Sequence, residues 1–197
     1  MPTLVLAALF ASALDPARAW SDRAGWKAAP EAELAGVDGK ETAPARVRAR
    51  WNNDWLFFEF VCRDEVVVAP GTKDGEEHFK LGDVVEIFVG TAGRPGYLEV
   101  HATPEGHKSV YAFRGYRQSA QAPGGCLVRA GTIPGGWRAV ISIPRDILGN
   151  QGPWDFLAGR YDYDEEGARP LLSSFPAQTG KADFHDRSRF ALLELQP

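Results

Sequence analysis

A few charged side chains in strand-like segments have the types and spacing to do chemistry. Glu86 interrupts the apolar run 83–89 (DVVEIFV), so it either faces solvent or is buried with partners, because an unpaired buried carboxylate is very costly. Glu99 and His101 are two residues apart and therefore share one face of a strand. If that face adjoins Glu86, the three residues form one polar site. Otherwise, Glu99 and His101 belong to a solvated face, and Glu86 forms a structural ion pair with an arginine of segment 45–51.

Arg160 lies in another strand-like segment, 155–163. Its planar guanidinium could donate two parallel hydrogen bonds to neighbouring hydroxyl groups of a ligand. The alternative is a salt bridge with Asp162, Asp164 or a carboxylate across the sheet. Both interpretations stay open on the residues alone.

Signatures of catalysis are absent from the chain. It has no G-x-S-x-G elbow and no phosphate-binding G-x-x-x-x-G-K-S/T loop. The histidines lack the H-E-x-x-H spacing, although His78, His101 and His185 could still converge on a metal. Glu86 and Glu99 could form a glycosidase pair. We assign no catalytic residue, no metal ligand and no cofactor, and keep calcium only as a structural ion for the Asp- and Gly-rich loops.

Composition narrows the class of protein. The 197 residues are 44% hydrophobic and carry a formal charge of −4 with both signs mixed, which is typical of a globular domain and not of a nucleic-acid binder. No apolar run is long enough to insert into a membrane. Cys62 and Cys126 either form one disulfide in an exported protein or are two buried small residues.

The first 19 residues allow two interpretations. The apolar run 4–10, followed by an A-x-A pattern at 17–19, resembles a signal peptide that is cleaved before Trp20. No Lys or Arg precedes the run, and Asp15-Pro16 lies close to the cleavage point. The competing interpretation is that residues 3–13 form the first strand of the domain.

Alternating patterns and turn residues predict an all-β protein. The segments 45–51 and 55–63, separated by Asn52-Asn53-Asp54, predict a β-hairpin. Further strands are expected at 83–89, 97–103, 109–116, 126–130, 137–143, 155–163 and 190–195. About ten strands with regular turns predict an antiparallel two-sheet, jelly-roll-like β-sandwich, with 20–197 as a single domain.

Short motifs in a fixed order resemble those of family 9 carbohydrate-binding modules and cover nearly the whole chain. They are Leu14-Asp15 with 26–29 (WKAA), 47–52 (VRARWN) with 55–58 (WLFF) and 63–64 (RD), 83–88 (DVVEIF), 136–144 (GWRAVISIP), 184–186 (FHD) and 190–193 (FALL). Three positions depart from the family pattern: Val140, Ala158 and Ala191.

The resemblance implies a non-catalytic domain that binds carbohydrate between two aromatic rings, helped by a polar rim. Phe184 matches one ring position, and Phe79 lies one residue from the other. The residues that we expect around the ligand are Phe79, Glu86, Glu99, His101, Arg160, Phe184 and His185. The resemblance also implies a secreted or periplasmic protein that acts in glycan capture or degradation with glycoside hydrolases as partners.

Two alternatives remain beside carbohydrate binding. Related sandwiches of the DOMON type hold a b-type haem for electron transfer, commonly through a methionine. The only methionine here is Met1, so His101 or His185 would have to bind the iron. The departures from the family pattern favour the second alternative, an interaction module that has lost sugar binding.

Overall fold

Two predicted hairpins form the centre of one layer of the molecule. β3 (Ala45–Trp51) pairs with β4 (Trp55–Arg63), and β9 (Leu127–Ile133) pairs with β10 (Gly136–Pro144). In the first turn, the side-chain oxygen of Asn52 accepts hydrogen bonds from the backbone N–H groups of Asp54 and Trp55, at 2.9 and 2.8 Å. The β3–β4 hairpin therefore arises from local turn chemistry, as the sequence predicts.

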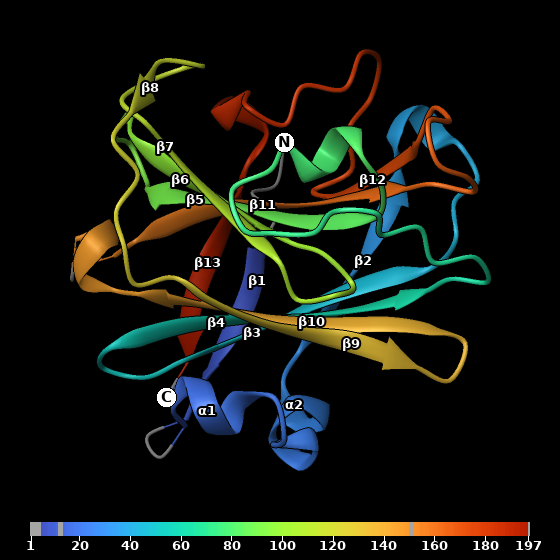
Figure 1. The fold of residues 1–197 in the computed structure, drawn as a ribbon. Coiled ribbons are helices and arrows are strands. Elements are labelled where there is room, and N and C mark those ends of the chain that lie inside the picture. Colours follow the sequence, from blue (N-terminus) through green and yellow to red (C-terminus); the bar gives the residue numbers. More distant parts are fainter. Residues whose placement is uncertain (1–4, 12–13, 150–151, 197) are drawn as a thin grey trace.

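The computed structural model describes residues 5–11, 14–149 and 152–196, which form a β-sandwich of two layers (Figure 1). The fold class is as predicted, but the described strands number 13 instead of about ten. The other strands are β1 Val5–Phe10, β2 Glu31–Gly36, β5 Val84–Thr91, β6 Tyr97–Ala102, β7 Lys108–Phe113, β8 Ser119–Ala120, β11 Trp154–Asp162, β12 Leu171–Phe175 and β13 Ala191–Gln196. The helices are α1 Pro16–Ala19, α2 Arg23–Ala28 and the 3₁₀ turns η1 Val37–Gly39, η2 His78–Lys80, η3 Asp146–Leu148 and η4 Arg187–Arg189.

The two layers are joined along one side of the sandwich. The hydrogen-bonded order runs β8-β7-β6-β5-β11-β12-β2-β3-β4-β10-β9, so β12 and β2 carry the ladder from one layer to the other. β13 and β1 make a second crossing, because β13 pairs with the start of β11 and β1 pairs with the end of β3. In Figure 1, β1, β13 and β2 run between the upper and lower layers. The segment that the sequence leaves open as a leader or a first strand is β1.

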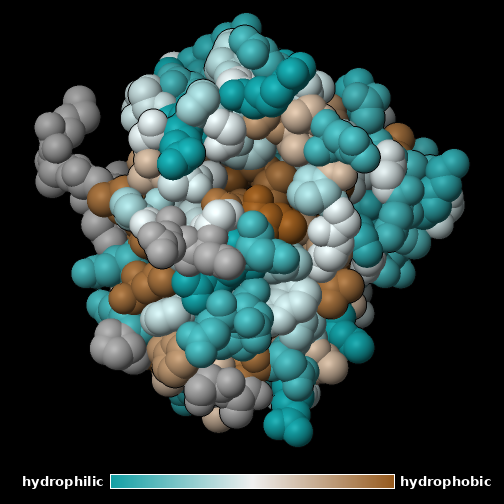
Figure 2. All heavy atoms as spheres, turned by 90° about the vertical axis from the view of Figure 1, so that its left-hand side faces the viewer, coloured by the Kyte–Doolittle hydropathy of each residue, from teal (hydrophilic) through white to brown (hydrophobic). Residues whose placement is uncertain are grey.

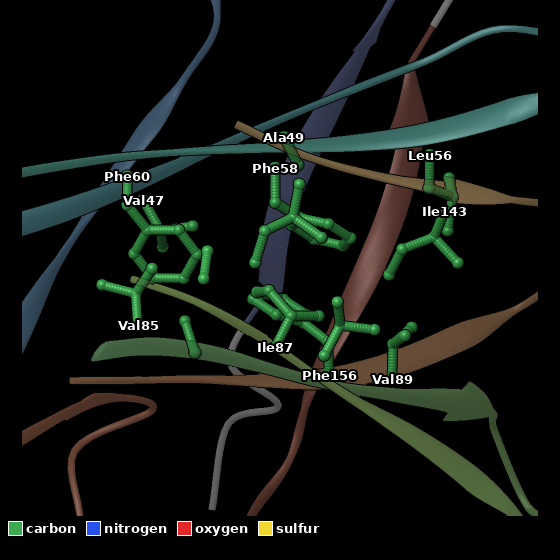
Figure 3. Close-up of a cluster of buried hydrophobic side chains, with 14 of the residues drawn as sticks. Val47, Ala49, Leu56, Phe58, Phe60, Val85, Ile87, Val89, Ile143 and Phe156 are labelled. Atoms are coloured by element: carbon green, nitrogen blue, oxygen red, sulfur yellow. The ribbon is translucent and has the colours of Figure 1, made fainter. Parts of the chain in front are cut away.

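Apolar side chains from both layers meet in the interior (Figure 3). Phe58 and Phe60 of β4 face Ile87 of β5 and Phe156 of β11, and all four are fully buried. Burying each such side chain contributes roughly 1.5–3 kcal/mol to folding. These residues alternate along their strands with residues of the outer faces, so the same pattern that builds the core also fixes which side chains point outward.

Short helices cover the outer face of the lower layer, from which arginines of β3 and β10 project (Figure 1). Arg50 is only 7% exposed, because it pairs with Asp22 at 2.6 Å beside α2 and lies over the ring of Trp26. Arg138 is fully buried against Glu59 and under the ring of Trp20. The N-terminal segment therefore turns part of this face into a second, partly charged core.

The side of the sandwich away from the crossing strands is open. Figure 2 views the molecule from the left-hand side of Figure 1 and shows hydrophobic side chains at the bottom of a hollow in this face. Within the described ranges, every helix is too short or too polar to cross a membrane.

Candidate functional site

The strand register gathers three of the predicted residues on the outer face of the upper layer. Glu86 of β5 is directly opposite His101 of β6 on one side and Gly159 of β11 on the other. Glu99 lies on the same face as His101, because the two are separated by one residue of β6. Side chains alternate between the two faces of β5. Val85 points into the core, so Glu86 points outward, towards Glu99 and His101.

Loops cover this face and leave a pocket of about 200 Å³ above the polar residues. In Figure 1, η2 and the red segment before β13 both lie over the upper layer, and they supply the cover. The pocket is lined by Phe79, Glu86, Phe88, Glu99, Arg117, Tyr161, Leu172, Ala182, Asp183, Phe184 and His185. Five of the seven predicted residues therefore line one pocket, and His101 contacts three of them, Phe79, Glu86 and Glu99.

His101 is the centre of the polar floor. Its Nε2 lies 2.6 Å from Glu99 Oε1 and 3.1 Å from Glu86 Oε1. The His101 ring is fully buried, and Glu86 is only 2% exposed. The three side chains therefore form one coupled group that water scarcely reaches.

Burial decides the protonation of this group. Removal from water, with the charge of Glu99 nearby, raises the pKa of Glu86 to about 8 despite the opposing effect of His101. Burial disfavours the charged form of His101, but the carboxylates Glu86 and Glu99 outweigh this effect and raise its pKa. The floor of the pocket consequently holds protons near neutral pH and can both donate and accept hydrogen bonds.

His185 reaches the pocket from the loop before η4. Its Nδ1 forms a hydrogen bond with the Tyr97 hydroxyl at 2.9 Å, and its Nε2 lies 3.9 Å from Glu99 Oε2. The imidazole is held edge-on by Phe88 and Phe113, with ring centroids 5.3 and 5.1 Å away. Burial lowers the pKa of His185, although Glu99 opposes this. The ring is thus fixed in orientation with Nε2 directed towards Glu99.

The two phenylalanines that the resemblance assigns to an aromatic clamp have different environments. Phe184 is 5% exposed and packs against Phe88, Tyr161 and the backbone of Gly159. Phe79 is partly exposed, and its ring centroid lies 5.9 Å from that of Tyr161. Phe184 therefore anchors the loop, and Phe79 and Tyr161 offer the more accessible ring surfaces.

Arg160 is not in the pocket. It points from β11 to the opposite face, where its Nη2 lies 2.6 Å from Asp162 and 3.1 Å from Asp64, and its Nη1 donates to the carbonyls of Ala43 and Arg63. It is fully buried, so the geometry matches the salt-bridge alternative. Asp83 lies within the same acidic cluster and accepts hydrogen bonds from two backbone N–H groups.

The arginines of β3, His78 and the two cysteines all lie outside the pocket. The arginines of β3 pair with Glu31, Glu59 and Asp22 on the lower layer, away from Glu86. His78 is buried and stacks against His107, so it does not join the group around His101. Both cysteines are buried as free thiols, and burial raises the pKa of Cys62 to about 12 and of Cys126 to about 11.

Sequence reasoning missed Tyr161, Arg117 and Asp183. Tyr161 could have been found, because it shares a strand face with Gly159 by the period of two. Arg117 and Asp183 form an ion pair at 3.0 Å between two loops at the rim, and no local pattern predicts such a contact. Larger hollows of about 300 to 690 Å³ lie elsewhere, but none of the predicted site residues lines them. The smaller pocket is the better candidate, because polar groups converge on it.

Comparisons with known proteins agree on the fold. No sequence-family profile matches the chain, and no curated protein matches its sequence. A protein from Bacteroides uniformis that is proposed to bind carbohydrate superimposes with a TM-score of 0.81 at 14% identity, covering 98% of this chain and 100% of that one. Family 9 carbohydrate-binding modules from Caldicellulosiruptor kristjanssonii, in complex with cellotriose and with glucose, superimpose with TM-scores of 0.67 and 0.69, each at 14% identity. Each covers 98% of this chain, and 93% and 95% of the modules. The chain therefore has the fold of family 9 carbohydrate-binding modules.

Proposed function

We propose that the chain binds carbohydrate in the pocket above Glu86, Glu99 and His101, without cleaving it. The observation that carries this proposal is the combination of ring surfaces from Phe79 and Tyr161 with a buried polar floor. Sugars offer apolar C–H faces to aromatic rings, and their hydroxyl groups need fixed donors and acceptors. The likeness in fold to modules that were crystallised with cellotriose and glucose supports the same function.

The size of the pocket favours a single sugar ring. Its volume of about 200 Å³ is below the ~300–1,000 Å³ that is usual for small-molecule sites. Arg117 and Asp183 stand at the rim, where further sugar units would contact them. We therefore expect the end of a glycan chain to enter the pocket, and internal units to bind weakly.

Titration calorimetry with glucose, cellobiose and cellotriose, together with a glycan array, tests this function. We expect saturable binding that Phe79→Ala weakens at least tenfold, because the sugar loses its stacking surface. Trp55→Ala is the matched control, since Trp55 is also partly exposed but lies on the opposite layer. A folded protein that binds no sugar on the array would refute the proposal and leave the interaction module as the next hypothesis.

The haem alternative gains no support from the site. His101 Nε2 faces two carboxylates, and His185 Nδ1 is engaged by Tyr97, so neither imidazole is presented to a wide apolar cavity. A purified protein with a Soret absorption band would revive it.

We further propose that β1 belongs to the mature domain, which acts in the periplasm or outside the cell beside glycoside hydrolases. Cleavage before Trp20 would remove β1, which pairs with both β13 and β3. Mass spectrometry of the exported protein tests this: we expect residues 5–11 to be retained. A mature chain that begins at Trp20 would contradict the proposal.

A further inference from the structure

Two buried carboxylates in the pocket floor share a single hydrogen-bond donor. His101 Nε2 carries at most one hydrogen, and it lies 2.6 Å from Glu99 and 3.1 Å from Glu86. Within the part of the chain that the structure describes, His101 is the only polar partner of Glu86, which is 2% exposed. The two carboxyl groups therefore depend on one imidazole, and both border a pocket that a ligand could enter.

Such a carboxylate is costly unless something compensates its charge. Removing an ionised carboxylate from water carries a penalty of several kcal/mol, which good pairing must offset. The compensating groups are His101, which can balance one carboxylate, and Arg117, which at the rim is already paired with Asp183. A divalent cation in the pocket would displace the protons that now hold Glu86, Glu99 and His101 together and would compensate both carboxylates.

The spacing of the donor atoms suits a metal ion. One ligand atom each from Glu86, Glu99 and His101 lies within 4.8 Å of the other two. Nitrogen and oxygen ligands bind a first-row divalent ion at about 2.0–2.2 Å, so neighbouring donors around it are roughly 3 Å apart. The observed contacts of 2.6 and 3.1 Å are close to that separation, and small side-chain shifts would complete the geometry.

His185 lies just outside this group of donor atoms and joins it if its side chain shifts towards them. Its Nε2 lies 3.9 Å from Glu99 Oε2, and its Nδ1 is engaged by the Tyr97 hydroxyl. Imidazoles that bind metals commonly have their other ring nitrogen in such a hydrogen bond, which orients the ring. His185 thus has the second contact typical of a metal ligand.

We propose that Glu86, Glu99, His101 and His185 bind one first-row divalent cation, of the Zn²⁺ or Mn²⁺ type, at the floor of the pocket. Two imidazoles with two carboxylates match these ions better than Ca²⁺, which prefers oxygen ligands alone. The cation neutralises both carboxylates and replaces the shared hydrogen. The four side chains would fill a tetrahedral Zn²⁺ shell, so a hydroxyl group of a ligand would enter from the pocket as a fifth ligand. Cation binding itself does not require the proposed sugar binding.

The test uses the full chain after removal of metals with a chelator. Calorimetric titration with Zn²⁺ and then with Mn²⁺ should give one site per chain, and Co²⁺ should give visible absorption bands that report its coordination. Glu86→Gln and His185→Gln should each weaken Zn²⁺ binding at least tenfold. His107→Gln is the control, because His107 is a partly exposed histidine outside the set and should leave affinity unchanged.

Absence of saturable binding, or equal affinity in both variants and wild type, would overturn the proposal. His185 lies in a loop and is not fully buried, so His185→Gln should fold. It keeps the test decisive even if Glu86→Gln fails to fold. Sugar titrations in the presence of the chelator separate the two proposals. Sugar binding without metal binding would refute the cation site alone, and the reverse would refute the sugar site alone.

Discussion

Replacing Phe184 with alanine tests whether this ring anchors the loop over the pocket. The ring is 5% exposed and packs edge-on against Phe88 and Tyr161, with centroids 6.1 and 5.9 Å away. A phenylalanine buries roughly 150–250 Å². At about 25 cal/mol per Å², losing most of that burial costs about 4 kcal/mol. The cavity adds to the cost, whereas partial collapse of the surface loop reduces it, so we expect a loss of about 3–5 kcal/mol.

Urea unfolding followed by tryptophan fluorescence measures this loss, because three of the tryptophans are fully buried in the core. Phe184→Leu is the control and should cost less than about 1.5 kcal/mol, since it keeps most of the volume. A loss below about 1 kcal/mol in Phe184→Ala, with an unchanged dependence on urea, would refute the anchor. The clamp role that the resemblance implies would then be the better description of this ring.

Two further predictions concern the strands beneath the pocket. Burial, with smaller effects from Asp64 and Asp162, raises the pKa of Asp83 to about 7, above its value of 3.8 in the unfolded chain. Protonated Asp83 therefore stabilises the folded state. This contribution is fully present below about pH 4 and is lost as the pH rises through about 7. The stability difference between wild type and Asp83→Asn should therefore fall between pH 4 and 7.5 in urea titrations, and a flat difference would contradict this. Gly159→Ala places a Cβ 2.8 Å from Phe184 Cε2 and should cost about 1–3 kcal/mol by overpacking, measured by the same unfolding assay. Phe184→Leu should partly relieve that clash, and strictly additive effects would show that the two residues do not touch.

The sequence predicts the hairpins because their information is local. Alternation in β3 and the Asn-rich turn before β4 suffice, and the structure confirms both. β12 and β2 were missed because their pairing connects segments about 140 residues apart, and neither shows clear alternation. Pairing between strands so far apart in the chain cannot be predicted from a short stretch of sequence.

The site residues likewise divide into those that a local pattern predicts and those that depend on long-range contacts. That Glu99 and His101 share a face follows from spacing alone, whereas their position beside Glu86 depends on the register of β5 and β6. Arg160 had a usable signal, because it alternates with Phe156 and Ala158, both of which lie in the core. Its inward direction was thus predictable, but its partner Asp64 was not, since Asp64 lies in the loop after β4, about 100 residues earlier in the chain.

The crossing strands also determine where two copies of the molecule could join edge to edge. β12 with β2, and β13 with β1, close one side, so the described strand order ends only at β8 and β9. β8 has two residues and pairs only with the end of β7, so β9 and the first part of β7 are the longer unpaired edges. Unprotected edges invite pairing with another chain, and charged side chains discourage it. Arg129 stands on β9 two residues after the exposed Leu127, in a position to keep this edge strand from pairing with a second chain.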